Sequence, residues 1–142
     1  MSTEVFLAFD FGEKYIGIAV GNTLTQQARS LGAIKSRNQN PAWDGITKLV
    51  KEWQPQALVV GLPLNMDDSE NLLTKRANKF GKQLQGRYNL AVHMVDERLT
   101  TRQALAQHSE SGNSKALAKQ DLDGISAALI LQTFLNDVRA PR

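Results

Sequence analysis

Three acidic residues stand at positions where an ionised side chain is costly. Asp10 ends the first apolar run of the chain (residues 5–9), and Glu97 follows the run that ends at Asp96. Asp123 lies in a segment that is apolar on almost every side. A carboxylate in apolar surroundings needs a hydrogen bond, a paired charge or a metal ion. Three such acids from three separate elements therefore indicate a divalent-metal site.

Each acid also has a purely structural interpretation when it is taken alone. Asp10 could cap a turn, as aspartates commonly do. Asp96 and Glu97 could complement the dipole of a helix that follows, and Asp123 could do the same in the first turn of the last helix. Glu97 fits this less well, because it continues the side of its strand that carries His93 and Val95. Capping does not readily explain all three acids together.

The chemistry that suits these residue types is metal-dependent phosphodiester cleavage. Mg²⁺ and Mn²⁺ prefer carboxylate and water oxygens. Two such ions held by a few acids can activate a water molecule and stabilise the leaving oxygen. No cysteine is present, and we expect His93 to pack in its strand and His108 to be solvated.

A run of basic residues favours a polyanionic partner. Five basic residues and no acidic one lie between positions 75 and 87: Lys75, Arg76, Lys79, Lys82 and Arg87. A solvated helix face is the ordinary explanation of such a run. The absence of acidic residues within it favours nucleic-acid binding instead, to which Lys14, Arg98, Lys115 and Lys119 could add positive charge near the acids. Arg98 could alternatively pair with a core acid.

Hydrophobic periodicity predicts an α/β fold with a mixed sheet and helices packed on it. The expected strands are residues 6–10, 15–21, 31–35, 57–60 and 91–96. The expected helices are one that Asn40 caps and Pro55 stops, one that begins near residues 69–70, a short one capped by Thr100 or Thr101, and one over about 121–138. A polar loop is expected at residues 109–114. The first strand is apolar on both sides, so it should be central. The second carries Gly17, Ala19 and Gly21 on one side, where another element could approach closely.

Length and composition indicate one domain over residues 1–138, with 139–142 as a frayed tail. No apolar run approaches the roughly 20 residues of a membrane span, and nothing resembles a signal segment, so we expect a cytoplasmic protein. The net charge of +3 and pI of about 9.3 permit a nucleic-acid partner without requiring one.

Four motifs together resemble the YqgF/RuvX family. They begin at Asp10-Phe11-Gly12, at Gly61-Leu62-Pro63-Leu64-Asn65-Met66-Asp67, at Asp96-Glu97-Arg98-Leu99-Thr100-Thr101, and at Asp123 followed by Ser126-Ala127-Ala128. Members of this family carry the provisional description of pre-16S ribosomal RNA nucleases and are also described as Holliday-junction-resolvase-like. The motifs occur in order and span nearly the whole chain.

The resemblance implies an RNase H-like fold, with a five-stranded mixed sheet whose first three strands are antiparallel. It also implies a metal-dependent nuclease with Asp10, Glu97 and Asp123 as catalytic and metal-binding residues, holding two Mg²⁺ or Mn²⁺ ions. The implied substrate is precursor 16S rRNA, favoured over DNA junctions, with ribosomal particles as partners and a monomer or homodimer as the working form.

Several residues depart from the family pattern, and none belongs to the acid triad. Gly21-Asn22 stands where many members have Ser-Asp, Tyr15 replaces a frequent basic residue, and Asp68 replaces a usual glycine. The stretch before Asp123 contains Gln120-Asp121 and is less basic than expected. These departures concern substrate grip and loop conformation.

The alternatives are a Holliday-junction resolvase and a non-catalytic nucleic-acid-binding factor in transcription or ribosome assembly. A third is an ATPase of the actin and sugar-kinase type. Such an ATPase needs two lobes, and a mere binder gains nothing from acids that face phosphates.

Overall fold

Five strands form one mixed sheet in the computed structural model, which describes residues 3–38, 40–65, 67, 69–97 and 119–139. The strand order is β3-β2-β1-β4-β5. The strands are β1 (Val5–Asp10), β2 (Tyr15–Asn22), β3 (Ala28–Lys35), β4 (Ala57–Leu62) and β5 (Ala91–Asp96). β1, β2 and β3 pair antiparallel, whereas β4 lies parallel to β1 and β5 parallel to β4. The predictions of a mixed sheet and of a central first strand are therefore confirmed.

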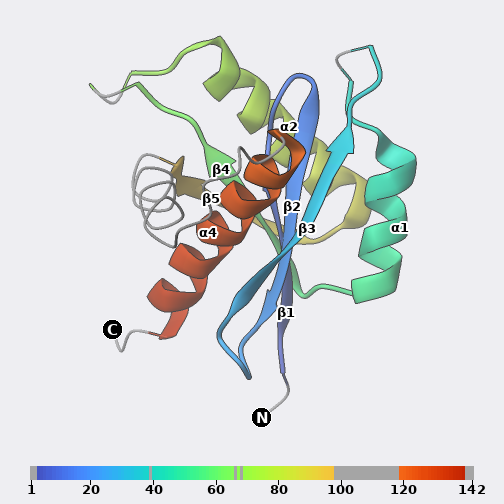
Figure 1. Ribbon diagram of the computed structural model, residues 1–142, viewed down its shortest axis with the longest axis vertical. Coiled ribbons are helices and arrows are strands. Elements are labelled where there is room, and N and C mark those ends of the chain that lie inside the picture. The colour runs from blue at the N-terminus through green and yellow to red at the C-terminus, as the bar shows by residue number, and fades with distance from the viewer. Residues whose placement is uncertain (1–2, 39, 66, 68, 98–118, 140–142) are drawn as a thin grey trace.

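The two faces of the sheet are covered by different helices (Figure 1). Helices α1 (Trp43–Trp53) and α2 (Leu72–Tyr88) contribute Ile46, Phe80 and Leu84 to a core with the inward side chains of β1, β2 and β4. Helix α4 (Lys119–Arg139) covers the opposite face with a second core. The residues of that second core are Phe6, Ala8, Ala19, Ala57, Val59, Ala127, Ile130, Leu131 and Leu135. The sheet is thus the middle layer between α4 and the α1–α2 pair.

The start of α1 differs from the prediction. Asn40 does not cap the helix, because its backbone N–H and C=O pair with those of Arg37 in an isolated bridge. The helix begins at Trp43 with Ala42 as the N-cap, and no side chain caps it. Its end is as expected, since Gln54 adopts a left-handed conformation with φ of 46° and Pro55 follows.

Other boundaries move by a few residues. β3 begins at Ala28, earlier than predicted, and its pairing with β2 shifts register between Ile18 and Ala19. α2 begins at Leu72 rather than near residue 70, and α4 includes Arg139, which had been expected in the tail. The short helix after Thr100, the loop at 109–114, and His108 all lie outside the described residues. No helix in the described ranges is long and apolar enough to cross a membrane.

Candidate active site

Asp10 lies on the sheet face that α4 covers. In β1 the side chains of Phe6 and Ala8 belong to the α4-side core, and Asp10 continues their alternation. Its partner on β2 is Gly17. The parallel pairing of β1 with β4 reaches Phe9 opposite Val60, and one further step places Asp10 beside Gly61. Asp10 is therefore flanked by a glycine on each neighbouring strand.

These two glycines make room for the other two acids. A Cβ atom at Gly17 would lie 1.9 Å from the backbone oxygen of Asp123, so α4 contacts β2 directly at this point. A Cβ atom at Gly61 would lie 2.9 Å from Cγ of Glu97. Asp123 therefore lies over the β2 side of Asp10, and Glu97 lies over its β4 side. The prediction that another element approaches the small-residue side of β2 is confirmed.

The electrostatics show that the three acids share one environment. The pKa of Asp10 is raised from 3.8 to about 10, first by burial, then by a side-chain hydrogen bond with Glu97 and by the negative charges of Glu97 and Asp123. The protonated form of the Asp10 carboxyl is therefore favoured, and this carboxyl makes a hydrogen bond with the side chain of Glu97. All three residues are nevertheless partly exposed, so solvent reaches the cluster.

The close contact at Gly17 gives a test of this geometry. We expect Gly17→Ala to destabilise the fold by roughly 1–3 kcal/mol, because the new methyl group meets backbone that cannot turn aside. Gly86→Ala is the matched control, since a Cβ at Gly86 in α2 meets nothing within 4 Å. Urea unfolding of both variants measures the difference. Equal stability of the two variants would contradict the packing of α4 against β2 at this position.

The donor set suits a hard divalent cation, although the acids are not arranged as finished ligands. Carboxylate oxygens are what Mg²⁺ and Mn²⁺ prefer, and a cation would relieve the repulsion that raises the pKa of Asp10. Within the described ranges, however, no three His, Cys, Asp or Glu residues form a group that could hold a metal ion. The side chains of Asp10 and Glu97 make a hydrogen bond with one another. Metal binding at these acids is therefore an inference from their chemistry and proximity.

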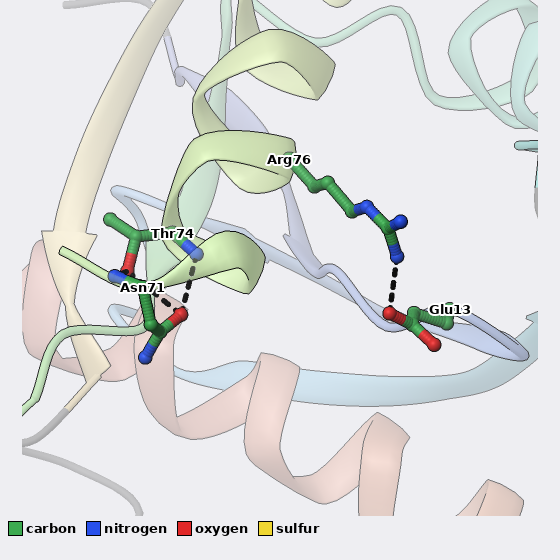
Figure 2. Close-up of polar contacts among 4 residues, drawn as sticks. All are labelled: Glu13, Asn71, Thr74 and Arg76. Carbon is green, nitrogen blue, oxygen red and sulfur yellow. Dashed lines mark hydrogen bonds and ion pairs between the residues drawn. The ribbon is translucent and has the colours of Figure 1, made fainter.

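Sequence reasoning missed a polar network that ties β4 to the start of α2. Asn71 caps α2 by accepting a hydrogen bond from the N–H of Thr74 at 2.9 Å, and its own N–H donates to the Thr74 hydroxyl at 3.1 Å (Figure 2). The buried Thr74 hydroxyl also donates to the carbonyl of Pro63. Asn71 donates to Asn65 in the loop that follows β4. The pair of capping residues three positions apart was the available signal.

The basic residues of α2 divide into two groups. Lys75, Lys79 and Lys82 are exposed, as predicted. Arg76 pairs with Glu13 of the β1–β2 hairpin (Figure 2), and Arg87 lies over the ring of Trp43 at 4.1 Å from its centroid. Although positions 75–87 contain no acidic residue, Arg76 therefore has an acidic partner, which comes from a distant part of the sequence.

The remaining predicted residues are placed only in part. Lys14 is exposed in the β1–β2 hairpin, a few residues after Asp10. Lys119 is the first residue of α4, whereas Arg98 and Lys115 lie outside the described part of the chain. His93 is exposed in β5, and its ring contacts that of Phe134 at 5.0 Å between centroids, in agreement with a packing role.

α2 packs on the face opposite α4, so its lysines and the acid cluster lie on different sides of the sheet. The two meet at one end of it. β1 and β4 run parallel, so the end of β4 that leads to α2 is the same end at which Asp10 lies. A substrate could therefore contact both only by passing around this end of the sheet.

Comparison with known proteins agrees with this architecture. The family model RuvX, described as Holliday junction resolvase, matches residues 4–137. A protein of Aeromonas salmonicida (strain A449) is 51% identical over 137 residues, which cover 96% of this chain and 98% of the relative. A protein of Haemophilus ducreyi is 53% identical over 137 residues, covering 96% and 99%. Both carry the provisional name pre-16S rRNA nuclease.

Solved structures show the same fold at low sequence identity. RuvC of Thermus thermophilus in complex with a Holliday junction substrate matches with a TM-score of 0.60 and 18% identity, over 96% of this chain and 98% of that one. The fowlpox virus resolvase with Holliday junction DNA matches with a TM-score of 0.58 and 12% identity, over 96% and 99%. The fold is thus the RNase H-like fold of resolvases. With a family model that matches almost its whole length and relatives about half identical to it, the chain belongs to the RuvX family of resolvase-like nucleases.

Proposed function

We propose that this protein is a metal-dependent nuclease that hydrolyses phosphodiester bonds during processing of the 5′ end of precursor 16S rRNA in the cytoplasm. The convergence of Asp10, Glu97 and Asp123 on one face of the sheet is the observation that carries the proposal. The names of the half-identical relatives in Aeromonas salmonicida and Haemophilus ducreyi support the choice of substrate.

The acids would hold one or two Mg²⁺ or Mn²⁺ ions. When bound, such ions activate a water molecule and stabilise the departing oxygen of a phosphodiester. Asp10 lies between the other two acids, so it could contribute to ion binding on either side. Asp10, whose raised pKa favours the protonated form, must lose its proton before its carboxylate can bind a cation. Glu97 and Asp123 then supply the remaining negative charge from either side.

The apolar second core fixes the position of the acids. Ile130 of α4 lies close enough to Gly61 that a Cβ there would come within 2.4 Å of its Cδ1. Such close packing fixes the distance between α4 and the sheet, and with it the position of Asp123. Such rigidity is what a catalytic cluster requires, because metal-dependent cleavage depends on the placement of charges.

A direct comparison of substrates tests the proposal. The purified chain is incubated with Mn²⁺ and either RNA carrying the precursor 5′ end of 16S rRNA or a four-way DNA junction. We expect cleavage of the RNA. Cleavage of the junction alone would establish the second candidate, a resolvase, which the family description and the fold both support. Binding of either substrate without cleavage at any metal concentration would favour a non-catalytic factor.

The exposed lysines of α2 provide a test of substrate grip. Replacing Lys75, Lys79 and Lys82 with Gln should weaken RNA binding and reduce the salt dependence of the binding constant. For single strands each lost phosphate contact lowers that log–log slope by about 0.7, so the triple variant should lose up to about 2. The cleavage rate at saturating substrate should change little.

Lys51→Gln is the control for this triple variant. Lys51 is an exposed lysine in the last turn of α1, at the end of the sheet away from Asp10. An unchanged affinity and salt slope in the triple variant would show that the lysines are only a solvated helix face.

A further inference from the structure

A small hollow lies beside the turn of the β1–β2 hairpin, where β2 begins and β3 ends. Its volume is about 420 Å³, and its lining residues are Glu13, Lys14, Tyr15, Lys35 and Ser36. This volume falls in the range of roughly 300–1,000 Å³ that is typical of small-ligand pockets. The hollow is held together by the backbone, because the N–H of Ser36 donates to the carbonyl of Lys14 at 2.7 Å.

Strand register places this hollow beside the acid cluster. Tyr15 pairs with Lys35, and Gly17 pairs with Asp10. Tyr15 and Gly17 are two residues apart on β2 and therefore on the same face, about 7 Å from one another along the strand. Tyr15 and Lys35 consequently lie on the α4 side of the sheet, two residues beyond the Asp10–Gly17 pair toward the hairpin turn.

The net charge of the hollow is positive. Lys14 and Lys35 are both exposed and carry the positive charge. Glu13 is the one acidic lining residue, and Arg76 of α2 pairs with its carboxylate (Figure 2). The ion pair leaves the two lysines without competition from Glu13. It also links the turn of the hairpin to α2.

The geometry points to this hollow as a nucleotide subsite for an unpaired strand. This inference rests on the proposed nuclease function and goes beyond it by naming the form of nucleic acid next to the scissile bond. The Tyr15 ring would stack on one base, and Lys14 and Lys35 would contact the phosphates on either side. An aromatic ring with flanking cations is the arrangement by which proteins bind single strands without reading their sequence.

The inference predicts a preference for single-stranded substrate at the cleavage position. A base in a duplex is already stacked and paired, so its face is not available to Tyr15. Extruding it would require the base to be unstacked and unpaired first. Tyr15 should therefore contribute to binding of a single strand and contribute little to binding of a duplex.

Binding measurements on three variants test the subsite. Each is made in an Asp10→Asn background, so that no cleavage occurs, and titrated by fluorescence anisotropy with a short single-stranded RNA and with the same strand annealed to its complement. We expect Tyr15→Leu to weaken single-strand binding about tenfold, the scale of one lost base–aromatic stack, and Tyr15→Phe to restore it. Lys35→Gln should lower the log–log salt slope by about 0.7. Lys51→Gln is the matched control, and circular dichroism verifies the fold of every variant.

The outcomes separate this inference from the proposed function. If Tyr15→Leu and Lys35→Gln bind the single strand with unchanged affinity and salt slope, the subsite is wrong, whether or not the Asp10-containing protein cleaves RNA. Equal losses on single strand and duplex would overturn the preference for an unpaired strand. Should Tyr15→Leu fail to fold, the subsite is tested by Lys35→Gln alone, and an unchanged salt slope in that variant would contradict it. If the native chain cleaves no substrate, the proposed function fails while these binding results still stand for or against the subsite.

Discussion

Asp10→Asn should abolish nuclease turnover while the protein stays folded. Asp10 is the acid that lies between Glu97 and Asp123, so removing its charge disrupts the whole ion-binding set. Metal ions supply several kcal/mol of transition-state stabilisation, and we therefore expect a loss on the order of a thousandfold or more. Single-turnover cleavage across a Mn²⁺ titration measures this loss, with circular dichroism to verify folding. The activity should not return at high metal concentration.

The two outer acids provide the internal comparison for this experiment. Glu97→Gln and Asp123→Asn each remove one charge from one side of Asp10 and conserve side-chain volume. Both should weaken metal affinity and recover part of their activity at higher Mn²⁺. Full activity in a folded Asp10→Asn variant would refute the metal-dependent mechanism at this cluster. Full activity in either outer variant would remove that residue from the catalytic set.

The stability of the metal-free protein should fall as the pH rises from about 4 to about 10. Asp10 keeps its proton in the folded state, where its pKa is about 10, and loses it near 3.8 in the unfolded state. Between these values the folded state binds more protons than the unfolded state, so the free energy of unfolding falls as the pH rises. Below pH 4 and above pH 10 this contribution no longer changes with pH.

Asp10→Asn isolates this contribution, because asparagine cannot titrate. The free energy of unfolding of the unsubstituted protein, measured relative to Asp10→Asn by urea unfolding with chelator present, should fall as the pH rises through neutral. Mg²⁺ or Mn²⁺ at millimolar levels should raise the melting temperature of the unsubstituted protein, more so at higher pH, and the increase should shrink in Asp10→Asn. Parallel pH profiles for the two proteins would show that folding does not raise the pKa of Asp10.

The amino-acid sequence by itself determined the layer plan and the candidate acids. β1 has apolar residues on both of its faces, which indicated a central strand. Over residues 17–21, β2 has only Gly and Ala on one face, which indicated that another element packs closely against it. Asp10, Glu97 and Asp123 could be singled out because ionised side chains in apolar segments demand an explanation. These inferences depend on residue patterns within single segments, which can be read without knowing how the segments pack.

Element ends depended on competing local interactions that sequence pattern ranks poorly. Asn40 has the right residue type for a helix cap, yet its backbone pairs with Arg37 and the cap is lost. α2 is capped by Asn71 rather than by Ser69 or Glu70. The Thr74 hydroxyl accepts a hydrogen bond from the Asn71 N–H and donates one to the carbonyl of Pro63. In both places the residue at which the helix begins depends on contacts with neighbouring backbone as well as on residue type.

Only the tertiary structure decided how the acids relate to one another and which cations remain available. The α4 backbone lies against Gly17 and Glu97 lies against Gly61, and these contacts join segments more than thirty residues apart in sequence. Arg76 pairs with Glu13, which is also far away in sequence, so the positive charge of Arg76 is neutralised. Lys14 and Lys35 are then the cations that line the hollow beside the hairpin turn. The physical reason is that charge pairing and desolvation depend on distances through space, so the raised pKa of Asp10 exists only when three distant strands and a helix pack together.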